Sequence, residues 1–165
     1  MLLGAIGLGS VPLCAAQAPA DGAQPPDDER PRERVEERNE YLASRGFYRR
    51  QAAGHGWFLT RSDPEVKRSR TVSDVLRTVP GVNARGTTGR VLVASHRQPG
   101  ACPLAVFVDG LYTTIRNVDE LTLEDIAGLE VYRGPSEVPL AYTAPSYDRT
   151  CGALLVWSRM QLSDD

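Results

Sequence analysis

The sequence predicts an α+β fold in which a small mixed β-sheet is flanked by short helices. Residues 71–79 place apolar side chains at positions i, i+3, i+4 and i+7, the spacing of one helical face. The runs 91–94 and 104–108 are continuously apolar, which is typical of strands covered on both faces. The order of these and later segments, a helix followed by strands, a short helix and further strands, describes such a module.

Turn sequences mark the ends of the predicted strands. Strands are expected at 57–60, 129–132 and 153–157, and a short helix is expected over 119–126. Asp-Gly between apolar residues predicts a hairpin, because both central positions of a type I′ turn require a positive φ. The corner residues predicted for the module are Pro80 with Gly81, Asp109 with Gly110, and Gly134 with Pro135.

The region before the module is expected to be an extension. Residues 21–32 are rich in proline and acidic side chains, which predicts a disordered linker. Residues 33–70 are interpreted as an N-terminal extension whose peripheral helix ends at Gly46. Basic pairs such as Arg49 and Arg50 are interpreted as solvated surface.

The first residues predict export. Residues 1–20 combine an apolar run of signal-peptide length with small residues at a suitable cleavage position, although no basic residue precedes the run. The run is too short to span a bilayer, so no transmembrane span is expected in the mature chain. Cys14 leaves a lipid anchor open as an alternative. The expected location is the periplasm or the outer membrane.

Cys102 and Cys151 remain once the signal peptide is removed. In an oxidising compartment such a pair is expected to form a disulfide, and the alternative is two reduced, buried cysteines. No metal or cofactor is expected, because neither His55 nor His96 has ligand spacing around it. The net charge of −2 provides no field that would attract nucleic acid.

No catalytic residue is predicted. The sequence has no nucleophile elbow, P-loop or paired zinc-ligand motif. The acidic residues of 119–125 are interpreted as the solvated first turn of a helix. A secreted hydrolase stays open as an alternative and would require His55 or His96 to lie beside Ser95 or an acidic residue in a cleft.

Four segments in order resemble the plug domain of TonB-dependent outer-membrane receptors. The sequence VSDVLRTVPGV at 72–82 is similar to the opening of these domains, and VFVDG at 106–110 is similar to their strand and turn. The sequence LTLEDIAGLEVYRGP at 121–135 and the closing GALLV at 152–156 complete the pattern. The plug-like domain is therefore expected over 71–159, followed by a tail at 160–165.

The resemblance implies a binding role. Acidic and basic residues of the family's "IEVxRGP" strand lie toward the barrel wall, so Glu130 and Arg133 are candidates for contact with a partner. Surface ion pairs are the alternative interpretation of these two residues. The chain is too short to include a barrel, and no apolar segment that could pair with TonB precedes the module. The expectation is a free-standing plug-like module whose partner is an outer-membrane barrel or another envelope protein.

Two functional hypotheses follow. In the first, the module binds a partner or ligand through the loops 85–89, 96–101 and 138–149, which a rigid sheet would hold in place. In the second, it is a structural or regulatory protein-association module of the periplasm. An exposed apolar patch around Tyr112, Tyr142 and Tyr147 would favour the second hypothesis.

Overall fold

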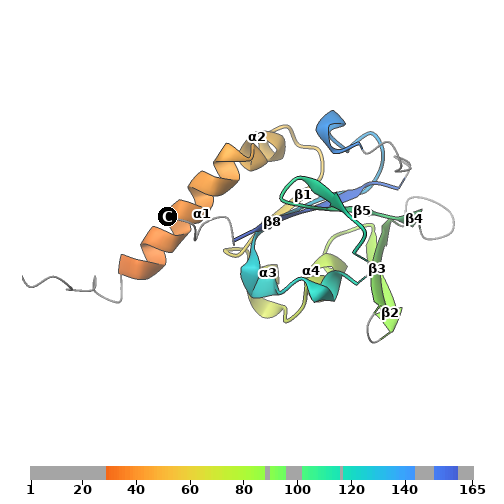
Figure 1. Cartoon of the computed structure of the whole chain (residues 1–165), viewed down its shortest axis with the longest axis horizontal. Helices are drawn as coiled ribbons and strands as arrows, with labels where there is room; N and C mark the ends of the chain where they lie inside the picture. The colour runs from red at the N-terminus through yellow and green to blue at the C-terminus, as the bar shows by residue number, and fades with distance from the viewer. Residues whose placement is uncertain (1–28, 88–89, 96–101, 116, 144–150, 160–165) are drawn as a thin grey trace, which may run out of the picture.

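The computed structural model describes residues 29–87, 90–95, 102–115, 117–143 and 151–159. Within these ranges the chain forms four α-helices and eight strands in two sheets (Figure 1). The predicted signal peptide, the tail and the loop 96–101 lie outside the described residues. The helices are α1 (Glu29–Ser44), α2 (Phe47–Ala52), α3 (Pro64–Arg68) and α4 (Val72–Arg77). The strands are β1 (Trp57–Thr60), β2 (Val82–Thr87), β3 (Arg90–Ser95), β4 (Cys102–Pro103), β5 (Ala105–Val108), β6 (Leu111–Thr113), β7 (Ile126–Tyr132) and β8 (Ala153–Ser158).

The larger sheet has five strands in the order β1-β7-β8-β5-β6. Strands β5 and β8 are parallel and the other neighbours are antiparallel, so the sheet is mixed as predicted. Strand β1 belongs to this sheet although it precedes residue 71, where the predicted domain begins. Strands β2, β3 and β4 form a second, antiparallel sheet that the sequence did not indicate. Its first strand, VNARGT, contains polar residues and a glycine and therefore lacks an apolar strand pattern.

Both faces of the five-stranded sheet are covered (Figure 1). On one face, side chains of β5, β7 and β8 pack with α3, α4 and the second sheet in a cluster that includes Val72, Leu76 and Leu154 (the α4 core). On the other face they pack under α1 and α2 in a cluster that includes Leu42 and Phe47 (the α1 core). Because both faces are buried, the central strands are apolar at almost every position.

Strand β7 changes its alternation at one irregular position. The register with β8 shifts between Ile126 and Gly128, so Ile126 and Leu129 both face the α4 core. A side chain at Gly128 would stand about 3.1 Å from both Leu42 and Phe47. The glycine therefore allows the end of α1 and the start of α2 to pack closely on the sheet.

Helix α1 begins at Glu29, inside the range predicted as linker, and ends before Gly46 as predicted. Gly46 has a φ of 74°, a left-handed conformation that glycine adopts without strain. Most described side chains of α1 are exposed, while Tyr41 and Leu42 at its end are buried. The helix is thus anchored to the sheet mainly through its last turn.

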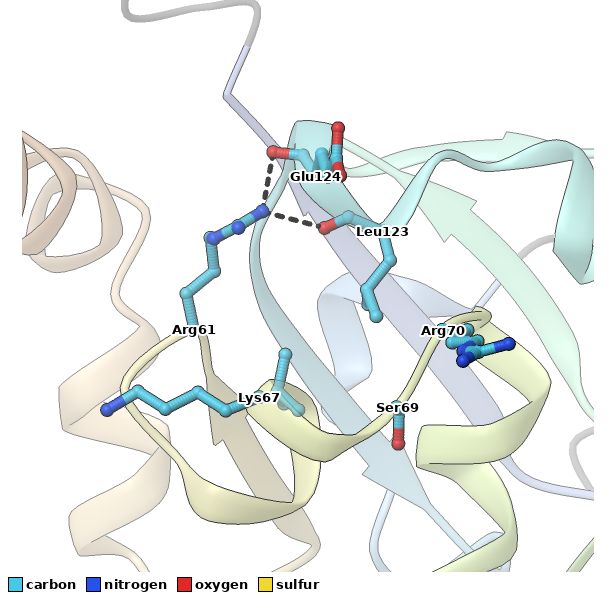
Figure 2. Close-up of a pocket in the computed structure, with 7 residues that line it drawn as sticks. Arg61, Lys67, Ser69, Arg70, Leu123 and Glu124 are labelled. Carbon is cyan, nitrogen blue, oxygen red and sulfur yellow. Dashed lines mark hydrogen bonds between the residues drawn. The ribbon is translucent and has the colours of Figure 1, made fainter.

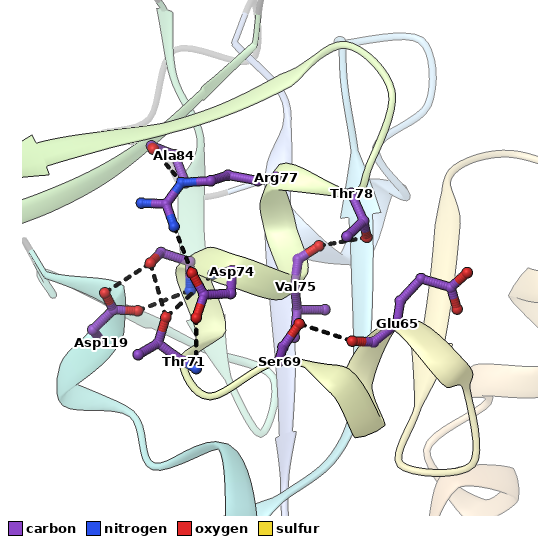
Figure 3. Close-up of polar contacts among 10 residues, drawn as sticks. Glu65, Ser69, Thr71, Asp74, Val75, Arg77, Thr78, Ala84 and Asp119 are labelled. Carbon is purple, nitrogen blue, oxygen red and sulfur yellow. Dashed lines mark hydrogen bonds and ion pairs between the residues drawn. The ribbon is translucent and has the colours of Figure 1, made fainter.

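The start of α4 is fixed by a network of hydrogen bonds (Figure 3). Thr71 and Asp74 form a reciprocal capping box, which satisfies backbone groups that the helix itself leaves free. The carboxylate of Asp119 accepts hydrogen bonds from the backbone N–H and the hydroxyl of Ser73, both at 2.8 Å. The acidic residue 119 therefore holds the helix start and is not a solvated helix face.

The prediction of a single short helix over 119–126 is wrong. The segment forms two 3-10 turns, Val118–Glu120 and Leu123–Asp125. Leu121 and Thr122 between them have extended backbone angles, so helical hydrogen bonding cannot continue through this point.

The predicted disulfide is present, and it links the two sheets. It links Cys102 at the start of β4 to Cys151 just before β8, with a Cα–Cα distance of 5.1 Å. The next residue, Gly152, has a φ of 100°, and a side chain there would collide with the backbone of Tyr132. The covalent link and the close backbone approach together fix the entry into β8.

We expect the Cys102→Ser, Cys151→Ser double variant to lose about 4 kcal/mol of folding free energy. The cysteines are 49 residues apart, and the bridge restricts a loop of that length in the unfolded chain. Urea unfolding of the oxidised protein, the reduced protein and the double variant measures the effect. Equal midpoints for oxidised and reduced protein would contradict it. Added reductant should not change the urea unfolding midpoint of the double variant.

Candidate functional site

A buried carboxylate lies at the centre of the α1 core. Glu130 of β7 is fully buried. Its Oε2 atom accepts hydrogen bonds from Arg50 Nε at 2.8 Å and from the Tyr132 hydroxyl at 2.6 Å. Its Oε1 atom accepts from Arg50 Nη2 and from Trp157 Nε1, both at 2.6 Å. The guanidinium of Arg50 thus binds the carboxylate through two parallel hydrogen bonds, while two aromatic side chains satisfy its remaining acceptor sites.

The electrostatics of this cluster keep the ion pair intact. Burial alone lowers the pKa of the Arg50 guanidinium, but its hydrogen bonds to Glu130 and the negative charge of that carboxylate raise the pKa above its ordinary value. Burial and the hydrogen bond to Glu130 also raise the pKa of the Tyr132 hydroxyl, so Tyr132 remains a donor. A buried charge is tolerated only when it is paired and fully hydrogen-bonded, and this carboxylate meets both conditions.

Aromatic rings surround the ion pair. The Arg50 guanidinium carbon lies 5.4 Å from the ring centre of Tyr142 and 5.5 Å from that of Trp157, within the range of cation–π attraction. The ring of Tyr142 also packs edge-on against Phe107 and Trp157. The segment that follows β7 is therefore tied to the sheet through Tyr142.

Sequence reasoning anticipated part of this arrangement. Glu130 faces away from Leu129 and Val131, as its alternating position predicted, but it is buried and does not form the surface ion pair considered as an alternative. The interpretation of Arg50 as solvated surface is wrong, because its side chain reaches that buried carboxylate. Direct contact of Glu130 with a partner stays a prediction. An acidic residue in an otherwise apolar strand was the available signal that a buried cation was required.

Arg133 lies at the end of β7 and is half-buried. Its backbone N–H donates to Glu137 Oε2 at 2.8 Å, and its Nη2 lies 3.2 Å from Glu137 Oε1. This is an ion pair within one turn of chain, near the surface. A contact between Arg133 and a partner also stays a prediction.

The predicted corner residues occupy the turns assigned to them. Gly81 follows Pro80 with a φ of 80° and lies between the end of α4 and the start of β2. Arg133 Nη1 donates to the carbonyl oxygen of Pro80 at 3.3 Å, so the first corner touches the third. Gly134 and Pro135 begin the turn that follows β7.

Asp109 and Gly110 form the predicted hairpin between β5 and β6. Their φ angles of 51° and 86° are both positive, as a type I′ turn requires. The Asp109 carboxylate has a further role that the turn alone did not indicate. It accepts hydrogen bonds from the Tyr41 hydroxyl at 2.8 Å, the Ser158 N–H at 2.8 Å and the Ser158 hydroxyl at 2.6 Å. The hairpin is thereby fastened to α1 and to the end of β8.

An apolar patch lies at the β6 edge of the five-stranded sheet. Leu111 and Tyr112 of β6 are 74% and 45% exposed, and Leu140 is 82% exposed. Tyr142, in the same 3-10 turn as Leu140, packs against Phe107, and so does Tyr112. We call Leu111, Tyr112, Leu140 and Tyr142 the edge patch. It includes two of the three tyrosines named as a possible association surface, and Tyr147 lies outside the described residues.

The hydrolase alternative gains no support from the described residues. Ser95 is buried and its hydroxyl donates to the carbonyl oxygen of Arg133 at 2.6 Å, so it has a structural bond. His55 is exposed, and His96 lies outside the described residues. Parts of the proposed recognition loops, 88–89, 96–101 and 144–149, also lie outside them.

The combination of a mixed sheet, ordered corner turns and a strand ending in Arg-Gly-Pro defines a receptor plug-like domain. The family model of the TonB-dependent receptor plug domain matches residues 50–145. This chain belongs to that family. Domains of the family sit within outer-membrane barrels and are related to transport.

Two solved structures are similar to part of the chain. One is the ferric enterobactin receptor PfeA from Pseudomonas aeruginosa, in a mutant form, with 19% identity, a TM-score of 0.47, and coverage of 63% of this chain and 17% of the receptor. Another is the RagAB peptide importer in its closed-closed state, with 16% identity, a TM-score of 0.47, and coverage of 62% and 12%. The chain thus spans a small part of these proteins. None of the curated proteins matches it. Among the described residues, no helix is both long and apolar enough to cross a membrane.

We expect Glu130→Gln to destabilise the fold by about 3 kcal/mol. One carboxylate oxygen is replaced by an amide NH2 group, which cannot accept hydrogen bonds, and the Arg50 cation loses its counter-charge. Chemical denaturation measures the change. Glu65→Gln, which removes an exposed carboxylate on α3, is the matched control and should change stability by less than about 0.5 kcal/mol. Equal small effects of both variants would contradict the assigned role of Glu130.

Alkaline titration provides a second test. Burial and the hydrogen bond to Asp109 raise the pKa of Tyr41 from its ordinary value of 10.0 to about 12. The folded state therefore disfavours the Tyr41 phenolate. The contribution of the neutral hydroxyl to the folding free energy is fully present below pH 10 and is lost as the pH rises toward 12. Phenolate absorbance should therefore rise, and the unfolding free energy should fall, between pH 10 and 12. Tyr41→Phe should make the fall in unfolding free energy smaller. A Tyr41 phenolate that forms in the folded protein near pH 10 would contradict the prediction.

Proposed function

We propose that this chain is a non-enzymatic, exported plug-like binding module of the cell envelope, and that its edge patch contacts an outer-membrane barrel or another envelope protein. The observation that carries the proposal is the edge patch. Two of its large apolar side chains, Leu111 and Leu140, are more than half exposed, which is unusual beside an open strand edge unless they contact another surface.

The use of the polar side chains supports a binding role. The carboxylates of Glu130, Asp109 and Asp119 all accept hydrogen bonds from groups that hold the fold together. The hydroxyl of Ser95 is bonded to the backbone of Arg133. General acid–base or nucleophilic catalysis needs groups that are free to bond a substrate, whereas these groups already form hydrogen bonds within the fold.

The rigidity of the module suits a recognition surface. The disulfide joins the two sheets, and the Arg50–Glu130 pair fixes α2 to β7. Contacts of Tyr142 with Phe107 and Trp157 fix the turn that presents Leu140. A patch held in this way loses little conformational entropy when it binds, which favours affinity.

The second candidate is a structural or regulatory protein-association module of the periplasm. It is favoured by the same edge patch, because the residues that line the described pockets are not those of the patch. A flat apolar surface suits association with a protein rather than capture of a small ligand. The two candidates differ in the partner that they require.

Chemical cross-linking in membrane envelopes that contain the tagged full chain, followed by mass spectrometry, distinguishes the candidates. A cross-linked outer-membrane barrel supports the plug-like module, and cross-links to soluble periplasmic proteins alone support the association module. Leu140→Asp should reduce recovery of the true partner by at least about tenfold, the effect expected for a central interface residue.

Trp57→Asp is the matched control, because Trp57 is an exposed apolar residue on β1, at the edge of the five-stranded sheet opposite β6. It should leave recovery unchanged. If Leu140→Asp and Trp57→Asp recover the same proteins in the same amounts as the unaltered chain, the edge patch is not the contact surface and the proposal fails.

A further inference from the structure

Four arginine side chains line a second feature, which is built from different elements. A pocket of about 250 Å³ is lined by one apolar residue, Val35, and by Arg34, Arg38, Arg61 and Arg159. The first two arginines come from α1, the third from the turn after β1, and the last follows β8. We call this feature the arginine pocket. No carboxylate is among its lining residues.

Two of these arginines, Arg61 and Arg159, are held by neutral acceptors. Arg61 Nη1 donates to the carbonyl oxygens of Leu123 at 3.1 Å and Glu124 at 2.7 Å (Figure 2). Arg159 Nη1 donates to the same Glu124 carbonyl oxygen at 3.2 Å. These bonds orient the guanidinium groups without neutralising them, because a carbonyl has no net charge. Positive charge is thereby concentrated in the pocket.

Arg38 is the most informative member of the set. It is only 8% exposed, and its Nε atom is buried with no hydrogen-bond partner among the described residues. Its Nη2 atom donates to the hydroxyl of Ser62 at 3.0 Å, again a neutral acceptor. A buried donor without an acceptor costs folding free energy, so an acceptor is expected to occupy the site in the functional protein.

The charges around Arg38 agree with an anion site. Burial lowers the pKa of Arg38, and the like charges of Arg61 and Arg159 lower it further. Tyr48 and, more weakly, Asp63 raise this pKa, and the Asp63 carboxylate already accepts hydrogen bonds from the N–H and hydroxyl of Thr60, at 2.6 and 2.9 Å. An anion in the arginine pocket would relieve the repulsion between these cations.

We propose that the arginine pocket binds a phosphate group. The planar guanidinium fork matches a phosphate oxyanion, and several converging arginines match a group with more than one negative charge. Arg61 also borders a neighbouring pocket of about 500 Å³ with Lys67 and Arg70, where a second phosphate or the rest of a ligand has room (Figure 2). The proposal concerns other residues than the edge patch and does not depend on the proposed function.

Calorimetric titration of the full chain with inorganic pyrophosphate, at constant ionic strength set by chloride, tests the proposal. We expect saturable binding that Arg38→Gln and Arg159→Gln each weaken by about ten- to a hundredfold, the loss of one charge-assisted contact. The control is Arg85→Gln, which removes the same charge from an exposed position on β2 and should leave the affinity unchanged. Circular dichroism verifies that each variant folds. If Arg38→Gln does not fold, the Arg159→Gln variant decides the test, because Arg159 is only half-buried.

Flotation with phosphatidylcholine vesicles, with and without phosphatidic acid, separates the two sources of a phosphate group. The ligand is a lipid headgroup if the unaltered chain binds the acidic vesicles, the Arg38→Gln and Arg159→Gln variants do not, and pyrophosphate binds only weakly. Binding of pyrophosphate alone identifies a soluble ligand. The proposal is overturned if neither probe binds saturably, or if Arg85→Gln weakens binding as much as the pocket variants do.

Discussion

The fold depends on the burial of one ion pair. The carboxylate of Glu130 lies in the middle of a strand whose other side chains are apolar, and such a charge is tolerated only if every acceptor site is used. Arg50, Tyr132 and Trp157 meet this requirement from α2, β7 and β8, so three elements must be in register before the charge is satisfied. Removing apolar surface from water drives collapse, but any apolar side chain can contribute to that. The ion pair permits one arrangement of α2 against the sheet, and in this sense it specifies the fold more than it stabilises it.

The same constraint explains where the edge patch lies. Tyr142 packs against Phe107 and Trp157 and lies within cation–π distance of Arg50, so the turn containing Leu140 is positioned by the buried network. Tyr112 reaches Phe107 from the hairpin, whose turn residue Asp109 is fastened to Tyr41 and Ser158. A surface built in this way is rigid although its residues belong to a short edge strand and a turn. An exposed edge usually carries a risk of non-specific pairing, and here the risk is limited because β6 has only three residues.

Local signals predicted most elements and few long-range contacts. The corner residues Gly81, Asp109 and Gly110 were predictable because each has a positive φ, a backbone conformation that favours its residue type at that position alone. The apolar runs predicted β5 and β8 since both faces of these strands are buried. Strand β2 was missed because VNARGT satisfies its backbone by pairing with β3, a contact that its own side chains do not indicate. The partners of Glu130 were missed for a related reason: Arg50 is 80 residues away in sequence, and no local pattern connects them.

Arg38 and Arg50 show how differently one residue type is used in a single chain. Arg50 meets a carboxylate that neutralises it, together with the faces of two aromatic rings, and its hydrogen bonds hold α2 on the sheet. Arg38 is also largely buried, but it meets a hydroxyl, and other arginines surround it. Replacing its cationic neighbours by apolar residues would remove the repulsion, so stability alone does not account for the cluster. A cost that folding does not require is a sign of selection for binding. The arginine pocket and the Glu130 cluster therefore lead to opposite conclusions about function.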